Sequence, residues 1–482
     1  MLPWQALDAV KTFIHPKLIF HYRNYHTSAA FIRANSITVS EGERHGLDYI
    51  YRQAIRRLLG HSNSASIDHL YSPIDLGGVG CVSAWDEYKI QSMVQIIRML
   101  TAKDYLIIDA AVQSIHNLRR SESDSFGLTL DLLLADALKV PQNSWWNKVS
   151  LAIRFFIKEQ GLVFSATVEH RNNSSPLIYF HITDEENLTT SFSSNNTHKL
   201  SPFLHKLVAL SHFKKWSSKP KAGLLASNLS VNKDFNRRFI KGKLGSTKLW
   251  IFLNKARVGD LPTNANRFNN NSLCRQCHQA DEWNPHALCG CPKMLPHINL
   301  RHNRILDILI KFLRANLLPS NNWEIMKEEL PPYFRCSLRP DIQIFNESCK
   351  VYVIIDVKCP YDSDLSMISQ DARNLDKYQI IVDSAQSALP HWDIRNFTFI
   401  IGCLGSWYLR NNDIFQTIRI RLSDVRNLAF NAASSAVKSS SDIWDIFQRA
   451  TGHLTFIVRF FPCCGAVALL FSIAFPLFSF SL

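Results

Sequence analysis

Several features that mark whole classes of protein are absent from this sequence. Residues 1–30 scatter Pro, His, Lys and Arg among the apolar positions, so we expect no signal peptide there. The eleven cysteines are not spread evenly along the chain, which argues against a small secreted disulfide scaffold. No internal repeat has the period of a solenoid or a propeller. Together these absences favour an intracellular globular protein.

Acidic residues are scarce relative to basic ones. There are 40 Asp and Glu against 54 Lys and Arg, which gives a formal net charge of +14. Such an excess favours a polyanionic partner, nucleic acid first, although a basic protein without such a partner has the same charge. Hydrophobic residues at 46% and aromatic residues at 11% are ordinary values, so most of the 482 residues should fold. The length predicts two or three domains.

Charged residues are missing altogether from Phe460 to Leu482. This run is long enough to cross a bilayer, but Pro462 and Pro476 interrupt it and no basic cluster flanks it. We therefore expect an apolar C-terminal tail over 441–482 and no membrane partner, with a tail anchor as the alternative.

Helical spacing of apolar residues dominates the first half of the chain. It predicts helices over 1–22, from Leu47 to Leu59 and over 104–138, and basic helices over 201–258. Residues 166–200 are rich in Asn, Ser and Thr, which predicts a loop or linker.

Basic side chains project from the second of these helices. Arg52, Arg56 and Arg57 lie away from its apolar stripe, so they are candidates for nucleic-acid phosphate contacts. Simple exposure to solvent is the alternative. Shortly afterwards, Gly77-Gly78-Val79-Gly80 predicts a turn, since no strand precedes it as a phosphate-binding glycine loop would require.

Four potential metal ligands lie close together further along the chain. Cys274, Cys277, His286 and Cys291 have the spacing C-x2-C-x8-H-x4-C. A Cys-x-x-Cys turn aims both thiolates at one point, and four such donors suit tetrahedral Zn²⁺. Because all four positions are filled, we expect a structural zinc site without the open position that catalysis needs.

Other residues nearby could replace members of this set. Cys289 is an alternative to Cys291, and either His278 or His297 is an alternative to the histidine. Buried free cysteines without a metal are the remaining possibility. If the zinc is present, it would hold together a small module that is too short to build its own core.

Two short runs of alternating or β-branched residues follow. Ile342 to Phe345 and Val351 to Val357 predict two strands that form a hairpin around a polar turn at 346–350. Side chains alternate along a strand, so Asp356 and Lys358 should share one face while Val357 points to the other.

Asp341 and Asp356 therefore lie at neighbouring strand ends. Two carboxylates can share a hard divalent cation such as Mg²⁺, and the ammonium of Lys358 can orient or help deprotonate a water molecule. These are the parts that phosphodiester hydrolysis needs. A turn residue beside a solvent-facing ion pair is the alternative.

Elements around this hairpin favour the first interpretation. Helical patterns run from Asn303 to Phe312 and over 366–388, and Asn396 to Cys403 predicts another buried strand. The expected result is an α/β layer with carboxylates at one edge.

Several motifs together resemble one family. They are the zinc spacing, Arg301-His302-Asn303, Arg339-Pro340-Asp341, Asp356-Val357-Lys358 and Lys377-Tyr378. Their order resembles the C-terminal half of site-specific retrotransposon proteins that lack long terminal repeats and carry a restriction-like endonuclease. The stretch from Leu2 to Gly80, with Pro3-Trp4-Gln5, Leu47-Asp48 and Arg56-Arg57, is similar to the thumb that follows that family's reverse transcriptase palm. Residues 81–250 and those after about 440 match only loosely.

The resemblance implies roles for individual residues. Asp341 and Asp356 would bind catalytic Mg²⁺, Lys358 would be the catalytic lysine, and Lys377 and Tyr378 would be auxiliary. The zinc module, with Arg301 and His302, would grip DNA. The family nicks chromosomal DNA and primes reverse transcription from the nick, which implies a DNA target, element RNA and a nuclear location. The palm is missing, and no adjacent Asp-Asp pair exists to hold polymerase metals, so polymerase activity is not expected of this chain.

We therefore expect a mixed α/β multidomain protein that acts as a DNA endonuclease. Its expected parts are a helical thumb-like region over 1–120, a basic helical connecting region over 121–260, a CCHC zinc knuckle over 261–300, a PD-(D/E)xK restriction-like α/β nuclease domain over 301–440, and the apolar tail over 441–482. The alternatives are a catalytically degenerate fragment that only binds nucleic acid, and a membrane-tethered interaction protein.

Overall fold

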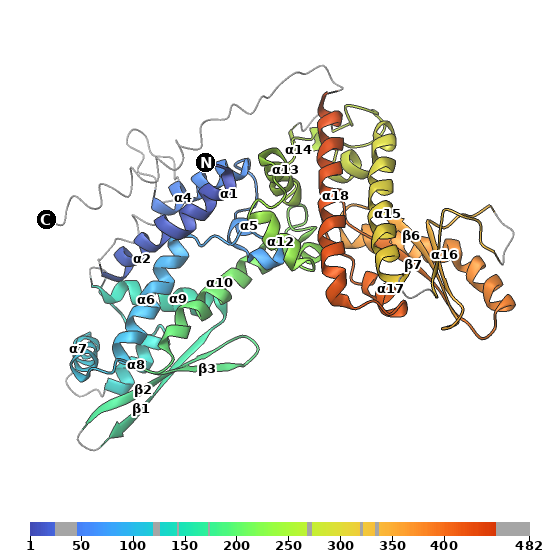
Figure 1. Cartoon of the computed structure of the whole chain (residues 1–482). Helices are drawn as coiled ribbons and strands as arrows, with labels where there is room; N and C mark the ends of the chain where they lie inside the picture. Colours follow the sequence, from blue (N-terminus) through green and yellow to red (C-terminus); the bar gives the residue numbers. More distant parts are fainter. Residues whose placement is uncertain are drawn as a thin grey trace.

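The computed structural model is a mixed α/β protein with two small sheets at opposite ends of an elongated molecule (Figure 1). It describes residues 1–24, 46–118, 126–141, 144–171, 174–267, 272–318, 322–332 and 337–449. The mixed α/β class is therefore confirmed. Among the described helices, none is both long and apolar enough to cross a membrane. The uncharged run from Phe460 lies outside the described residues.

The N-terminal part is helical, as its apolar spacing predicts. Its elements are α1 (Pro3–Ala9), a π-helical turn (Val10–Ile14), α2 (His15–Asn24), α4 (Leu47–Leu59), α5 (Ile67–Tyr71), a 3-10 turn (Ile74–Leu76) and α6 (Ala84–Leu100). Helix α4 has the predicted bounds and ends at Gly60, whose φ of +69° is a conformation that glycine adopts without strain. The glycine-rich segment after α5 forms the expected turn.

The first sheet occupies the segment for which we expected a loop. The surrounding elements are α7 (Tyr105–His116), α8 (Phe126–Leu134), α9 (Trp146–Gln160), β1 (Val163–Arg171), β2 (Ser174–Thr183), β3 (Thr189–Phe192) and α10 (Leu200–Ser217). The three strands are antiparallel in the order β1-β2-β3. The prediction of a loop over 166–200 is wrong. Apolar side chains alternate with polar ones along these strands, and the abundance of Asn, Ser and Thr made this alternation difficult to recognise.

That alternation gives the first sheet two unlike faces. Phe164, Phe180 and Ile182 are buried in a core shared with α6 to α10. On the outer face, Thr167 and Ser191 hydrogen-bond to opposite ring nitrogens of His181 at 2.9 and 2.8 Å. The polar composition therefore belongs to one face of a sheet and not to a linker.

A central core joins residues that are far apart in the chain. Its connecting elements are α11 (Ala226–Leu229), α12 (Lys233–Ile240), α13 (Thr247–Arg257), α14 (Asn264–Arg267), a π-helical turn (His286–Gly290) and a 3-10 turn (Pro292–Met294). Buried members of this core range from Leu7 and Trp250 to Cys274 and Trp444. The expected boundaries near 120 and 260 therefore do not separate independent cores.

The second sheet lies in the C-terminal part. The elements here are α15 (Leu295–Leu317), β4 (Glu324–Lys327), β5 (Ile342–Asn346), β6 (Val351–Lys358), α16 (Asp364–Ala388), β7 (Asp393–Ile400), α17 (Asn411–Thr417) and α18 (Leu422–Arg449). The strand order is β4-β5-β6-β7, with β6 and β7 parallel and the other pairs antiparallel. The predicted hairpin, following helix and final strand are confirmed, whereas β4 was not predicted.

Helices cover both faces of this second sheet. Alternate residues of β6, such as Val353 and Ile355, pack against α15, α17 and α18. Tyr352 and Ile354 face the opposite way, toward α16. Figure 1 shows the sheet between α15 and α16. Helix α18 continues to Arg449, so the expected start of an apolar tail at 441 is wrong.

Candidate functional site

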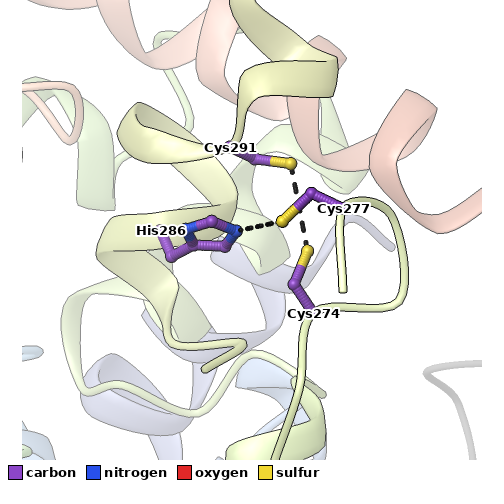
Figure 2. A group of neighbouring side chains, drawn as sticks. All are labelled: Cys274, Cys277, His286 and Cys291. Carbon is purple, nitrogen blue, oxygen red and sulfur yellow. Dashed lines mark hydrogen bonds between the residues drawn. The ribbon is translucent and has the colours of Figure 1, made fainter. Parts of the chain in front are cut away.

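The four predicted zinc ligands meet at one point (Figure 2). The Cys274–Cys277 segment turns back on itself, with Cys274 N donating to Ala280 O at 2.7 Å and His278 N donating to Cys274 O at 2.9 Å. His286 and Cys291 come from the π-helical turn and the residue after it. All four donor atoms lie within 4.8 Å of one another.

The separations of these donors suit a four-coordinate metal ion. Cys274 Sγ and Cys291 Sγ are 3.9 Å apart, and Cys277 Sγ is 3.3 Å from His286 Nε2. Thiolates bound at about 2.3 Å around a tetrahedral ion are roughly 3.8 Å apart, so little movement is required. The cluster could therefore hold a metal ion.

The structure decides between the alternative ligands. Cys289 points away from the cluster and accepts a hydrogen bond from Arg301 Nη2 at 3.5 Å. Within the described residues, neither His278 nor His297 belongs to the cluster. His278 also adopts a positive φ of 55°, as the residue that closes the Cys-x-x-Cys turn.

A buried ion pair supports the loop that carries the cysteines. Glu282 is fully buried, and its carboxylate accepts hydrogen bonds from Arg275 Nη2 at 2.5 Å and from Arg275 N at 2.8 Å. Asn264 N donates to the same carboxylate at 2.8 Å. This ion pair was not predicted from the sequence, because the position of Arg275 between Cys274 and Cys277 does not indicate which acidic residue it contacts.

The second sheet brings the predicted acidic residues together. Ile342 pairs with Ile355 in the antiparallel register, so Asp341 and Asp356 come opposite each other at the strand ends. Asp341 Oδ2 accepts a hydrogen bond from Val357 N at 2.6 Å. Val357 is buried on the other face, as alternation predicts.

Asp356 is nearly buried and lies among the other predicted residues. Its Oδ2 pairs with Lys358 Nζ, and its Oδ1 accepts from the Tyr378 hydroxyl at 2.8 Å. Lys377 Nζ in turn donates to that hydroxyl at 2.8 Å. Strand β6 therefore contributes the carboxylate of Asp356 and the amine of Lys358 to one hydrogen-bonded group, and α16 contributes the amine of Lys377 and the phenol of Tyr378.

His302 reaches the same site from α15. Its Nε2 lies 3.1 Å from Asp341 Oδ2 and 3.0 Å from Val357 O. The hydrogen bond to Asp341 raises the pKa of His302 despite its partial burial. Burial alone would raise the pKa of Asp341, but His302 and Lys358 more than offset this and hold it below its ordinary value. The Asp341 carboxylate is therefore ionised at neutral pH.

Arg301 is not available to grip DNA, contrary to our expectation. Its side chain is fully buried, and Nη1 donates to Leu288 O at 3.1 Å and to Ser440 Oγ at 2.9 Å. Its Nη2 donates to Cys359 O at 3.2 Å. The arginine joins the cysteine module, α18 and the end of β6, because its position on α15 faces inward.

The basic face expected on α4 is also incomplete. Arg56 is buried and donates to Ala65 O at 2.8 Å, so the expectation that it contacts phosphates is wrong. Arg52 lies 3.8 Å from Asp48 in an ion pair, and Arg57 is exposed. The chain after α4 folds back over Arg56, which helical periodicity cannot reveal.

A second group of potential metal ligands was not foreseen. His15, Glu87 and His205 come from α2, α6 and α10, and with the cysteine cluster they complete the groups of this kind among the described residues. No short sequence spacing connects them. Asp341 and Asp356 belong to neither group, so the ligand set by itself does not indicate Mg²⁺.

Comparison of the sequence with models of known protein families gives no match, and comparison with curated proteins gives none either.

Proposed function

We propose that this chain is a retrotransposon-derived DNA endonuclease whose active site is built from Asp341, Asp356 and Lys358. The observation that carries the proposal is the register of β5 and β6, which places Asp341 and Asp356 at the same edge of the sheet, with Lys358 bonded to Asp356. This is the arrangement that the PD-(D/E)xK pattern requires. Lys377 and Tyr378 belong to the same hydrogen-bonded group.

The residues suggest how a DNA phosphodiester would be hydrolysed. Asp341 and Asp356 would hold Mg²⁺, which when bound supplies charge stabilisation and an acidified water. Lys358 Nζ would leave Asp356 and orient the attacking water toward phosphorus. Tyr378 would keep Asp356 in its rotamer through the bond to Oδ1. His302 would hold the ionised Asp341 in place from α15.

We assign the cysteine and histidine cluster to Zn²⁺ with a structural role. Three thiolates and an imidazole are the donors that zinc prefers, and four protein ligands leave no position for substrate. Arg301 connects this module to Cys359, the residue directly after Lys358. The zinc would therefore stiffen one wall of the acidic site.

The chain's partners follow from this assignment. The net charge of +14 suits the backbone of nucleic acid, and we propose target DNA and element RNA as the partners and the nucleus as the location. Residues 1–120 would serve as the thumb-like region, and nicking would supply the primer end for reverse transcription.

Plasmid nicking tests the assignment. The variant Asp356→Asn keeps the size of the side chain but removes the charge that holds the cation. We expect Mg²⁺-dependent nicking to fall by roughly 10²-fold or more, as loss of a metal ligand does. Asp383→Asn is the matched control, because Asp383 is an exposed acid on the same α16. Undiminished nicking by Asp356→Asn would sink the proposal.

One observation favours binding without cleavage as the second candidate. Both oxygens of Asp356 and one of Asp341 already have protein partners. These carboxylates therefore have hydrogen bonds and an opposite charge nearby without a metal ion. A degenerate nucleic-acid-binding protein would retain DNA in a salt-dependent manner. Retention of DNA with no nicking in Mg²⁺ or Mn²⁺ would favour this candidate.

A further inference from the structure

The group formed by His15, Glu87 and His205 is separate from both sites described above. Glu87 Oε2 lies 2.8 Å from His15 Nε2 and 2.7 Å from His205 Nε2. The glutamate is fully buried, while the side chains of His15 and His205 retain 13% and 26% of their exposure. The three residues thus form a cluster in which the glutamate is buried and the two histidines, His205 more than His15, are partly exposed.

The hydrogen bonds of His205 restrict where its proton can be. Its Nδ1 lies 2.6 Å from Ser201 O, a carbonyl that can only accept, so Nδ1 must carry a hydrogen. In the neutral ring, Nε2 then presents a lone pair to the carboxylate of Glu87 at 2.7 Å. Two lone pairs at this distance repel each other. Either a second proton or a cation between them removes the repulsion.

A histidine on the same helix shows what a purely protonated arrangement looks like. His212 lies between two carboxylates, with Nδ1 3.0 Å from Asp68 and Nε2 2.9 Å from Asp86. Both ring nitrogens of His212 therefore need hydrogens. His205 has only one carboxylate, and it shares that oxygen with His15.

His15 Nε2 faces the same carboxylate oxygen, and it presents a lone pair to a metal ion when the ring proton is on Nδ1. In the described part of the chain, its buried Nδ1 has no hydrogen-bond partner, so Glu87 is the group that sets the position of the ring proton when no metal ion is bound. The second oxygen of Glu87 accepts from the amide of Gln91, which also holds Arg23 through its own oxygen at 2.7 Å. Among the described residues, the partners of Glu87 Oε2 are the two imidazoles.

We propose that His15, Glu87 and His205 bind a divalent transition metal ion of the zinc class, with the fourth position open to solvent. Two histidines and one glutamate are a known zinc ligand set, and the carbonyl bond to His205 Nδ1 is the outer support that such ligands have. Donors bound at about 2.0 to 2.1 Å around a tetrahedral ion are roughly 3.3 Å apart, so the three donor atoms must move apart by about 0.5 Å. The partial exposure of His205 permits this movement. The ion would fasten α2, α6 and α10 together.

Metal stoichiometry of the full chain tests this site with Co²⁺ as the probe. After removal of bound metal, Co²⁺ is titrated in the presence of a competing chelator, and thiolate charge-transfer bands report the cysteine cluster alone. We expect these bands to saturate with the first equivalent, and a second equivalent to add only ligand-field bands of nitrogen and oxygen ligands. Saturation of the wild-type chain with a single ion would overturn the proposal without any variant.

Variants assign the second ion to its ligands. His205→Gln keeps a donor for Glu87 but is a poor metal ligand, so it should lose the second ion and keep the thiolate bands. Cys277→Ser should do the reverse. His212→Asn is the matched control, a carboxylate-bound histidine on the same helix, and should bind both ions. A His205→Gln chain that still binds the second ion would contradict the site.

Discussion

His212 offers a quantitative test of how α10 is attached to the N-terminal helices. Its ring bridges Asp68 on α5 and Asp86 on α6, and only 16% of the side chain is exposed. Burial alone would lower the pKa of His212, but the hydrogen bonds to the two carboxylates raise it from 6.5 to about 9. The charged ring therefore stabilises the folded chain across neutral pH.

The size of this contribution follows from the pKa. Each tenfold change in proton affinity is worth about 1.4 kcal/mol, so a rise from 6.5 to about 9 corresponds to roughly 3 kcal/mol. Because the pKa is higher in the folded state, the contribution is complete below the unfolded value of 6.5. It declines as the pH rises and is lost above about 9.

The perturbation is His212→Asn, compared with wild type by denaturant unfolding at about pH 6, 7.5 and 9.5. In the variant, Asp86 retains its ion pair with Lys89 at 2.9 Å and Asp68 retains its ion pair with Lys219 at 2.5 Å. Neither carboxylate therefore loses its last charged partner. We expect the variant to lose about 3 kcal/mol of unfolding free energy near pH 6 and little near pH 9.5. Titrations common to both proteins cancel in the difference. A difference that does not change with pH would refute the proposed charge state.

Three further substitutions test the supports of the two candidate sites. Cys277→Ser should release the metal ion of the cysteine cluster and lower the thermal midpoint by several degrees, which metal analysis and calorimetry would detect; full metal content in the variant would contradict the ligand set. Arg301→Met removes hydrogen bonds to buried carbonyls and should cost about 3 kcal/mol in denaturant unfolding, and a neutral substitution would show that the link is dispensable. Tyr378→Phe should slow nicking by roughly 10-fold with a stability change within about 1 kcal/mol, because Asp356 loses only its orienting bond; an abolished activity would instead indicate that the phenol takes part in the reaction.

Local patterns were enough to predict elements whose residues interact mainly with near neighbours. The helix from Leu47 to Leu59, the hairpin that ends at Lys358 and the Cys-x-x-Cys turn all appear with their expected form. Each depends on a repeat of 3.6 or two residues, or on a turn of a few residues. The position of Asp341 and Asp356 at one edge of the sheet follows from the same hairpin register, so both acidic candidates could be named in advance.

Only the tertiary structure decided which polar side chains are buried and with what they pair. Arg301 and Arg56 have the spacing of surface residues, yet other segments fold over them. His15 and His205 converge on Glu87 from positions 72 and 118 residues away. Such contacts depend on how helices pack, and packing is set by the whole apolar surface rather than by any short stretch of sequence. The local order of residues therefore determined the helices, strands and turns and the place of the two acidic residues. Which groups surround these residues was decided only by the complete fold.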